Sequence, residues 1–168
     1  METINVDITY TAADLQKSYT LHFKKMYPVK SKLLIIFGIL IIALGTAMLL
    51  FKDIFNNAGW LAWFYVIFGV VAIIYHFWQY STIGRRMFKK LPDFKHAFHY
   101  IITEEGIQIT SVTVSSDLKW EHYHKATITD DMILLYPNKF RYNLFPKRFF
   151  SDRDFKILQA KVKSLAIE

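Results

Sequence analysis

Two histidines in the second half of the sequence have a spacing that could begin a metal site. In the segment WEHYHK, His122 and His124 are two residues apart and would share one face of a strand, where two imidazoles can start a zinc site. Neighbouring Glu121 would point to the opposite face in that geometry, and the spacing offers no evident third ligand. The alternative is a pair of surface histidines, and we predict no metal site.

Adjacent acidic residues could in principle act as a general acid and a general base. The pairs Glu104–Glu105 and Asp130–Asp131 both fall in predicted turns, where solvated carboxylates are common. The sequence also contains no glycine-rich phosphate loop, no HExxH motif and no serine nucleophile elbow. We therefore predict a protein that is not an enzyme and uses no cofactor.

Cations alternate with aromatic residues near the C-terminal end. We call four of these cations the basic cluster: Lys139, Arg141, Lys147 and Arg148. If residues 140–145 form a strand, Phe140 and Tyr142 face the core and Arg141 faces outward. Residues 146–148 would then precede a helix N-terminus, whose free backbone N–H groups favour anions. We expect the basic cluster to bind acidic lipid headgroups or an acidic partner, and the alternative is a solvated basic edge over core aromatics.

The elements that carry these residues include two long apolar segments. The sequence is 53% hydrophobic and 17% aromatic, and the excess lies in residues 33–51 and 60–80. As helices, the 19-residue runs 33–51 and 60–78 are each about 28 Å long, close to the hydrocarbon thickness of a bilayer. We predict two transmembrane helices, whereas a buried core helix is the alternative for either run alone. The first run begins too late, at Leu33, for a cleavable signal peptide.

Basic residues flank both apolar segments and predict their orientation. The eight flanking cations are Lys24, Lys25, Lys30, Lys32, Arg85, Arg86, Lys89 and Lys90. The connection between the segments holds only Lys52, beside Asp53. Positive residues stay on the cytoplasmic side, so we predict a multi-pass protein of the cell membrane with both termini cytoplasmic. The same cations are expected to contact acidic headgroups, and this position explains them without nucleic-acid binding, the rival interpretation.

Small residues recur at a spacing of seven in each apolar segment. Gly38 and Gly45 lie on the first, and Ala62 and Gly69 lie on the second. Stripes of small residues allow helix backbones to approach closely in lipid, where apolar burial gives no driving force. We therefore predict a tightly packed antiparallel pair of helices.

The remaining segments predict a small sheet-rich domain. INVDITY alternates, with Ile4, Val6, Ile8 and Tyr10 on one face, as in a half-buried strand. Thr11 and Asp14 form a capping box for a following helix. Residues 91–150 contain six short strand-like runs, and Ser151 caps a terminal helix.

These elements predict one split domain. Because the 78 residues from Leu91 onward give a marginal core, we expect the N-terminal strand to join their sheet. The predicted domains are residues 1–32 (strand and amphipathic helix), 33–80 (transmembrane hairpin) and 81–168 (cytoplasmic domain).

The order of these segments resembles the YcxB-like family of bacterial membrane proteins. The resemblance rests on TAADL, the two apolar segments, ITEEGIQI, LKW at Trp120, ILLY and LFPKRFFSDRDF, and its most specific part is the turn at residues 146–149. It implies a membrane α+β protein: a two-helix transmembrane hairpin inserted into a cytoplasmic PH-like β-barrel or sandwich of six or seven strands with a C-terminal helix. The resemblance carries over no catalytic residue.

Together these features predict a membrane-anchored, non-enzymatic module. Its cytoplasmic PH-like domain is expected to bind a protein partner or acidic lipid headgroups, with a second copy of the chain as another possible partner. A different hypothesis is an immunity or accessory protein that recognises a membrane toxin or a transporter subunit through its two spans. The sequence does not name the partner.

Overall fold

The structure is a computed structural model that describes residues 2–51, 54, 59–139 and 141–165, except for the side chains of Lys30 and Ser31. Its helices are α1 (Ala12–Met26), α2 (Lys30–Leu50), α3 (Gly59–Lys90) and α4 (Asp152–Ser164). Its strands are β1 (Ile4–Ile8), β2 (Phe98–Ile102), β3 (Gly106–Thr110), β4 (Ser115–Lys119), β5 (Lys125–Ile128), β6 (Met132–Asn138) and β7 (Arg141–Pro146). The chain divides into two compact units, one of Met1–His22 with Gly84–Glu168 and one of Phe23–Ile83.

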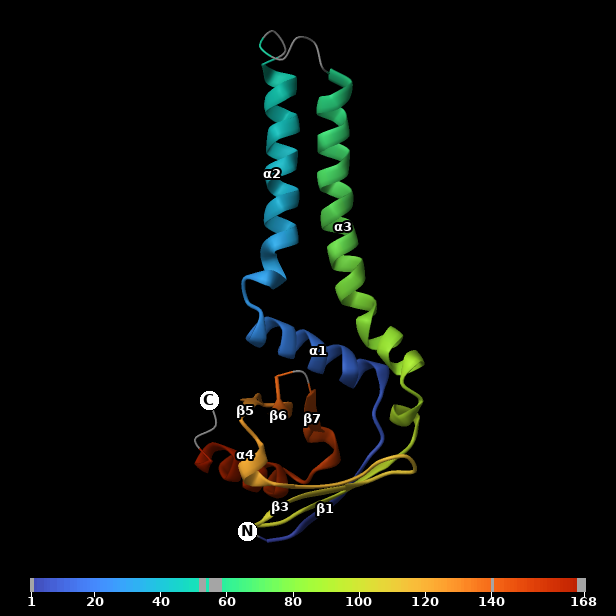
Figure 1. The fold of residues 1–168 in the computed structure, drawn as a ribbon, viewed down its shortest axis with the longest axis vertical. Helices are drawn as coiled ribbons and strands as arrows, with labels where there is room; N and C mark the ends of the chain where they lie inside the picture. Colours follow the sequence, from blue (N-terminus) through green and yellow to red (C-terminus); the bar gives the residue numbers. More distant parts are fainter. Residues whose placement is uncertain (1, 52–53, 55–58, 140, 166–168) are drawn as a thin grey trace. The chain divides into compact units, whose positions relative to one another are not determined.

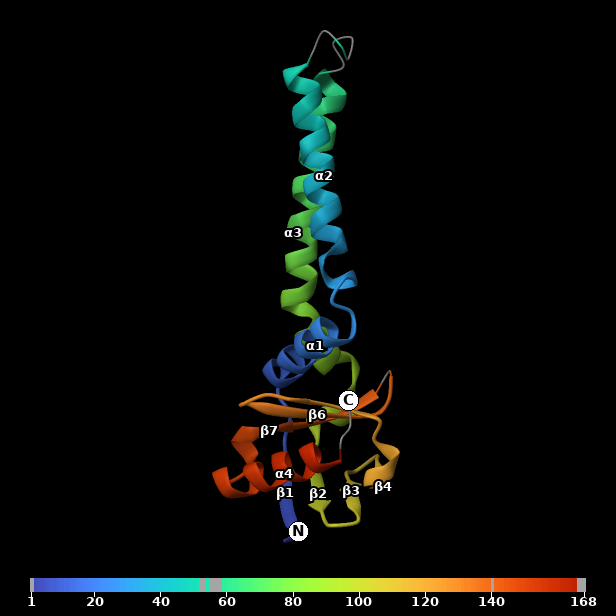
Figure 2. The same ribbon diagram turned by 90° about the vertical axis from the view of Figure 1, so that its left-hand side faces the viewer.

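The strands form two antiparallel sheets, one with the order β1-β2-β3-β4 and one with the order β5-β6-β7. All six strand-like runs after residue 91 are strands, so their prediction is confirmed. The prediction left a barrel or a sandwich open, and the barrel is wrong, because the strands form two separate sheets. Figure 2 shows β1 to β4 in one layer and β6 and β7 in another. After β4 the chain turns through a short 3-10 helix, η2 (Trp120–His122), and this turn ends the first ladder before β5 begins the second.

The N-terminal strand lies at the edge of the four-stranded sheet. β1 pairs with β2, with Ile4 opposite Ile102 and Ile8 opposite Phe98. The predicted apolar face of β1 is buried: Ile4, Val6, Ile8 and Tyr10 are at most 7% exposed. Strands separated by both long helices therefore share one hydrophobic core.

The core lies between the two sheets and is extended by two helices. β6 is buried along its first five residues, which places it at the centre of the three-stranded sheet with no solvent-facing side. α1 contributes Leu15, and α4 contributes Phe155, Leu158 and Val162, the face expected from their spacing. These contacts make both helices part of the same folded unit as the sheets.

Local hydrogen bonds begin both of these helices at the predicted residues. The backbone N–H of Asp14 donates to Thr11 Oγ1 at 3.2 Å, and that of Thr11 donates to Asp14 Oδ2 at 2.8 Å. At α4, the backbone N–H of Asp154 donates to Ser151 Oγ at 3.0 Å. The capping box and the serine cap are therefore confirmed.

Gly106, at the start of β3, lies where a close backbone contact leaves no room for a side chain. Its φ does not lie in the left-handed region, so backbone conformation does not demand glycine there. A Cβ at this position would lie 2.4 Å from the Leu118 carbonyl oxygen and 2.9 Å from Lys119 Cα. The close approach of β4 is what excludes a side chain.

Two helices are long and apolar enough to cross a membrane, residues 32–50 and 59–90, and the second unit contains the first of them and the second as far as Ile83. Most of their apolar windows are exposed in the structure, and the helices lie side by side (Figure 1). α3 continues as one helix through the basic stretch to Lys90, ten residues beyond the predicted end. The connection that contains Lys52 and Asp53 lies outside the described residues.

The small residues of the two helices face one another. A Cβ on Gly69 would lie 2.7 Å from the Gly38 carbonyl oxygen, and one on Gly45 would lie 2.6 Å from the Ala62 carbonyl oxygen. Ala62 itself has no exposed surface. Glycine therefore allows the two backbones to touch at these points, as the spacing predicted.

Candidate functional site

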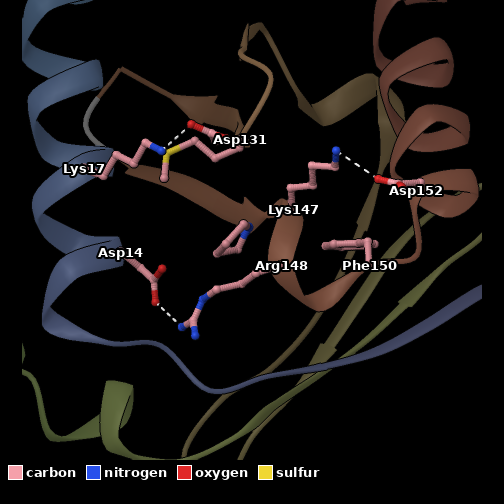
Figure 3. Close-up of a pocket in the computed structure, with 9 residues that line it drawn as sticks. Asp14, Lys17, Asp131, Lys147, Arg148, Phe150 and Asp152 are labelled. Atoms are coloured by element: carbon pink, nitrogen blue, oxygen red, sulfur yellow. Dashed lines mark hydrogen bonds and ion pairs between the residues drawn. The ribbon is translucent and has the colours of Figure 1, made fainter.

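The structure does not bring the four members of the basic cluster together. Lys147 and Arg148 lie in η3 (Lys147–Phe149), the short 3-10 helix between β7 and α4, and both line a cavity of about 430 Å³ (Figure 3). Arg141 begins β7 and lines a different cavity. Lys139 is exposed in the turn before β7. Phe140, which was expected to face the core, lies outside the described residues.

Arg148 binds a carboxylate that belongs to α1. Its Nη2 lies 2.6 Å from Asp14 Oδ2 and 3.4 Å from the Thr9 carbonyl oxygen. The guanidinium carbon also lies 4.3 Å from the centre of the Phe149 ring, an aromatic face that favours cations. Arg148 therefore balances a buried acid and joins η3 to the start of α1.

Lys147 is paired with the first residue of α4. Its Nζ lies 2.9 Å from Asp152 Oδ1, and its backbone N–H donates to the Asp131 carbonyl oxygen at 2.8 Å. The hydrogen bond and the charge of each partner raise the pKa of Lys147 and lower the pKa of Asp152. Both side chains are exposed, so this pair contributes little to stability.

A third ion pair lines the same cavity. Lys17 on α1 donates to the Asp131 carboxylate, and this contact lowers the pKa of Asp131 (Figure 3). Each of the three cations around the cavity, Lys17, Lys147 and Arg148, thus has its own carboxylate. An added anion would have to displace these acids, so the geometry does not favour the anion site that we expected at this turn.

The sequence did not reveal that acidic residues would pair with these cations. Asp14 was predicted only as part of a helix cap. In the structure, Asp14 performs both functions, and the first turn of α4 carries two carboxylates of its own. Those carboxylates already interact with the positive end of the helix dipole, which a separate anion would otherwise use.

The cations that flank the long helices are mostly exposed. Exposed side chains are those of Lys24, Lys25, Lys32, Arg85, Lys89 and Lys90, whereas Arg86 is half-buried. The side chain of Lys30 lies outside the described residues. Within the first unit, Gly84 fixes the end of α3 against α1, because its N–H donates to Gln16 Oε1 at 2.8 Å and a Cβ would lie 2.5 Å from the Ala12 carbonyl oxygen.

The histidines do not have the geometry assumed for a metal site. His122 ends the 3-10 helix η2, and His124 lies in the segment before β5, so the two do not share a strand face. Both are exposed. Among the residues that the structure describes, no three histidine, aspartate, glutamate or cysteine side chains are grouped to hold a metal ion.

Sequence reasoning missed the cavity that Arg141 lines. This cavity measures about 480 Å³. Its walls come from β2, β3, β7, the end of α3 with the segment that follows it, and the start of α1 with the segment before it. Most of its lining residues follow the periodicity of core positions, so no local pattern marks them as a site. They form a cleft only because segments distant in the sequence are brought together.

One known family matches the part of the chain that contains β3 to β7, η3 and most of α4. Residues 102–161 match the family model described as YcxB-like protein. The predicted resemblance to the YcxB-like family is confirmed. The YcxB-like segment covers about a third of the chain, from the last residue of β2 into α4, and it includes the turn at residues 146–149. Searches of curated proteins and of solved structures gave no match.

Proposed function

We propose that this chain is a membrane-anchored, non-enzymatic module that holds a PH-like domain at the cytoplasmic face of the cell membrane. The observation that carries the proposal is the pairing of β1 with β2 across the entire helical hairpin. Both ends of the hairpin connect to one folded unit. Two membrane crossings then leave both termini on the same side, and the flanking cations favour the cytoplasm.

The strand arrangement supports a PH-like domain. Four antiparallel strands in chain order, three more in a second sheet and a C-terminal helix agree with the number and order of elements that the family resemblance implies. Within the folded unit, the largely buried Asp14 carboxylate is paired with the half-exposed Arg148 guanidinium. A domain of this kind, fixed at a membrane surface, is suited to recognising a protein partner there.

We assign the contacts with acidic lipid headgroups to the cations at the ends of the long helices rather than to the basic cluster. Lys147 and Arg148 are occupied by carboxylates, whereas Lys24, Lys25, Lys89 and Lys90 have exposed side chains next to the apolar segments. Each such cation near an anionic surface contributes about 1 kcal/mol of attraction. The headgroup contacts would then orient the module rather than serve as its specific ligand.

Cysteine labelling tests the topology without background, because the chain has no cysteine of its own. Single cysteines would replace Asn57, in the connection between the apolar segments, and Glu168, at the C-terminus. A membrane-impermeant maleimide should label the first and not the second in intact cells, and both in permeabilised cells. Labelling of the C-terminal cysteine in intact cells would reverse the topology and overturn the proposal.

Replacing residues 33–80 by an unrelated two-helix hairpin separates the two functional hypotheses. Proximity labelling from the C-terminus should identify the same neighbouring proteins for both chains if the cytoplasmic domain makes the recognition. Loss of those neighbours in the chimera, with the domain still protease-resistant, would favour recognition of a membrane partner through the spans.

A further inference from the structure

The cleft that Arg141 lines has the size and the walls of a small-molecule site. It measures about 480 Å³ and lies within the unit that contains both sheets. Its floor is made of buried side chains, among them Leu15, Phe98, Ile109 and Leu144. Leu91, which is 39% exposed, lies at its edge. Ligand sites in proteins are commonly cavities of roughly 300–1,000 Å³ with mostly apolar walls and a few polar groups.

The tyrosine hydroxyls in this floor are already used. Tyr10 Oη donates to the Leu144 carbonyl oxygen at 2.7 Å, so the hydrogen bond of 2.7 Å between Tyr10 and Tyr100 must have Tyr100 as its donor. Burial raises the pKa of Tyr100 to about 12, and both phenols are therefore neutral at physiological pH. The floor presents carbon surface rather than free donors, which suits the apolar body of a ligand.

Arg141 supplies the cleft with a cation that has no carboxylate bound to it among the described residues. Its backbone N–H donates to Asn138 Oδ1 at 2.9 Å, but among the described residues its guanidinium takes part in no ion pair. This distinguishes it from Arg148, which has a carboxylate of its own. A guanidinium offers a planar pair of N–H donors that matches the two oxygens of a carboxylate.

One acidic residue limits the charge that the cleft can accept. Asp93 lines the same cleft, and its Oδ1 accepts a hydrogen bond of 2.7 Å from Thr113 Oγ1. This carboxylate repels an anionic ligand, and the repulsion grows with each negative charge that the ligand carries beyond the one that Arg141 can pair. The cleft therefore suits a ligand with one anionic group and disfavours headgroups with several phosphates.

We propose that this cleft binds a free small amphipathic carboxylate, with an aliphatic or aromatic body on the Tyr10–Tyr100 floor and its carboxylate on Arg141. This inference goes beyond the proposed function, which assigns no ligand to the cleft. It also gives Arg141 a role separate from that of Lys147 and Arg148, with which its sequence position had grouped it.

The test uses octanoate and the full chain in phosphatidylcholine nanodiscs, with the methionine methyl groups labelled with carbon-13. Three of the five methionines serve as probes. Met87 lines the cleft, Met132 lines the cavity at η3, and Met48 lies in α2. Octanoate should shift the Met87 resonance saturably and leave that of Met132 in place. A shift of Met48 reports octanoate that only partitions into the bilayer. Octanol, with the same chain and no charge, should bind at least about tenfold more weakly, because hydrogen bonds to charged groups are among the strongest.

Two variants distinguish loss of the Arg141 charge from loss of the folded structure. Arg141→Gln should weaken octanoate binding by about tenfold or more, whereas Lys139→Gln, which removes an exposed cation outside the cleft, should leave it unchanged. An unchanged Met132 resonance shows that the Arg141 variant is folded. A third variant, Leu91→Trp, would fill the mouth of the cleft and should lower the affinity with Arg141 intact.

Three results would overturn the proposal. The first is the absence of a saturable Met87 shift, and the second is equal binding of octanoate and octanol. The third is loss of octanoate binding when phosphatidylglycerol replaces part of the phosphatidylcholine, because a membrane lipid would then be the occupant of the cleft.

Discussion

Arg148 Nη2 lies 2.6 Å from Asp14 Oδ2, across 134 residues of sequence. The Asp14 side chain is only 11% exposed, and its Oδ2 also accepts hydrogen bonds from the Thr11 backbone N–H at 2.8 Å and hydroxyl at 2.7 Å. One carboxylate therefore caps α1 and holds η3 at the same time. The basic residue that the sequence suggested for anion binding is a structural contact between two ends of the folded unit.

Arg148→Gln should lower the free energy of unfolding by about 1–3 kcal/mol, because the buried Asp14 carboxylate loses its cation. Chemical denaturation of the full chain in nanodiscs, followed by the near-ultraviolet signal, measures this loss. Arg153→Gln is the matched control, since Arg153 pairs with Glu2 and both side chains are at least 67% exposed. That control should change stability by less than about 0.5 kcal/mol, and equal losses in the two variants would contradict the structural role of Arg148.

Ile8→Ala should destabilise the sheet-containing unit by about 2–5 kcal/mol. Ile8 has no exposed surface and lies opposite Phe98 in the ladder between β1 and β2. In limited proteolysis, the segment that follows Leu91 should be cleaved faster in this variant than in the wild type. Asn5→Ala changes an exposed position of the same strand and should be cleaved like the wild type. Equal cleavage of all three proteins would show that β1 does not support the sheet.

Gly69→Leu should separate the two long helices. A Cβ alone at this position would lie 2.6 Å from Ile42 Cγ1 and 2.7 Å from the Gly38 carbonyl oxygen, so a larger side chain cannot fit. Spin labels on cysteines at Phe51 and Trp60, both exposed, should report a longer and broader distance distribution. Gly59→Ala is the control, because a Cβ there meets no atom within 4 Å. An unchanged distribution in the leucine variant would argue against the glycine contact.

Alkaline pH should unfold the sheet-containing unit together with ionisation of its buried tyrosines. Burial raises the pKa of Tyr100 and Tyr136 to about 12 and also raises the pKa of Tyr10, Tyr123 and Tyr142. Because the folded state holds these protons more tightly, the stabilising effect is complete below the ordinary tyrosine pKa near 10 and is lost as pH rises through the raised values.

Tyrosinate absorbance and circular dichroism, recorded over the same pH series, test this expectation. These five of the ten tyrosines should ionise only as the circular dichroism of the folded state disappears. Ionisation of all ten near pH 10 with the fold intact would contradict the burial of the Tyr10–Tyr100 pair.

Local sequence patterns were sufficient for most of the elements. Alternation identified β1, the capping residues Thr11 and Ser151 marked the helices, and turn signals separated the six later strands. These signals depend on neighbouring residues, so one sequence contains them in full. The end of α3 was predicted ten residues too early. The helix continues beyond its apolar residues because the following turn, at Gly84, packs against α1, a contact that the local sequence does not reveal.

The amino-acid sequence by itself determined two apolar helices of membrane length, the small residues between them, and the types of the elements around them. Only the tertiary structure decided that the strands divide into two sheets and that Arg148 and Lys147 are paired with acids. It also decided that Arg141 lies in a separate cleft, where it pairs with no acid among the described residues. The physical reason is distance along the chain. Periodicity and capping act within a few residues, whereas an ion pair or a cavity depends on which remote segments the shared core brings together.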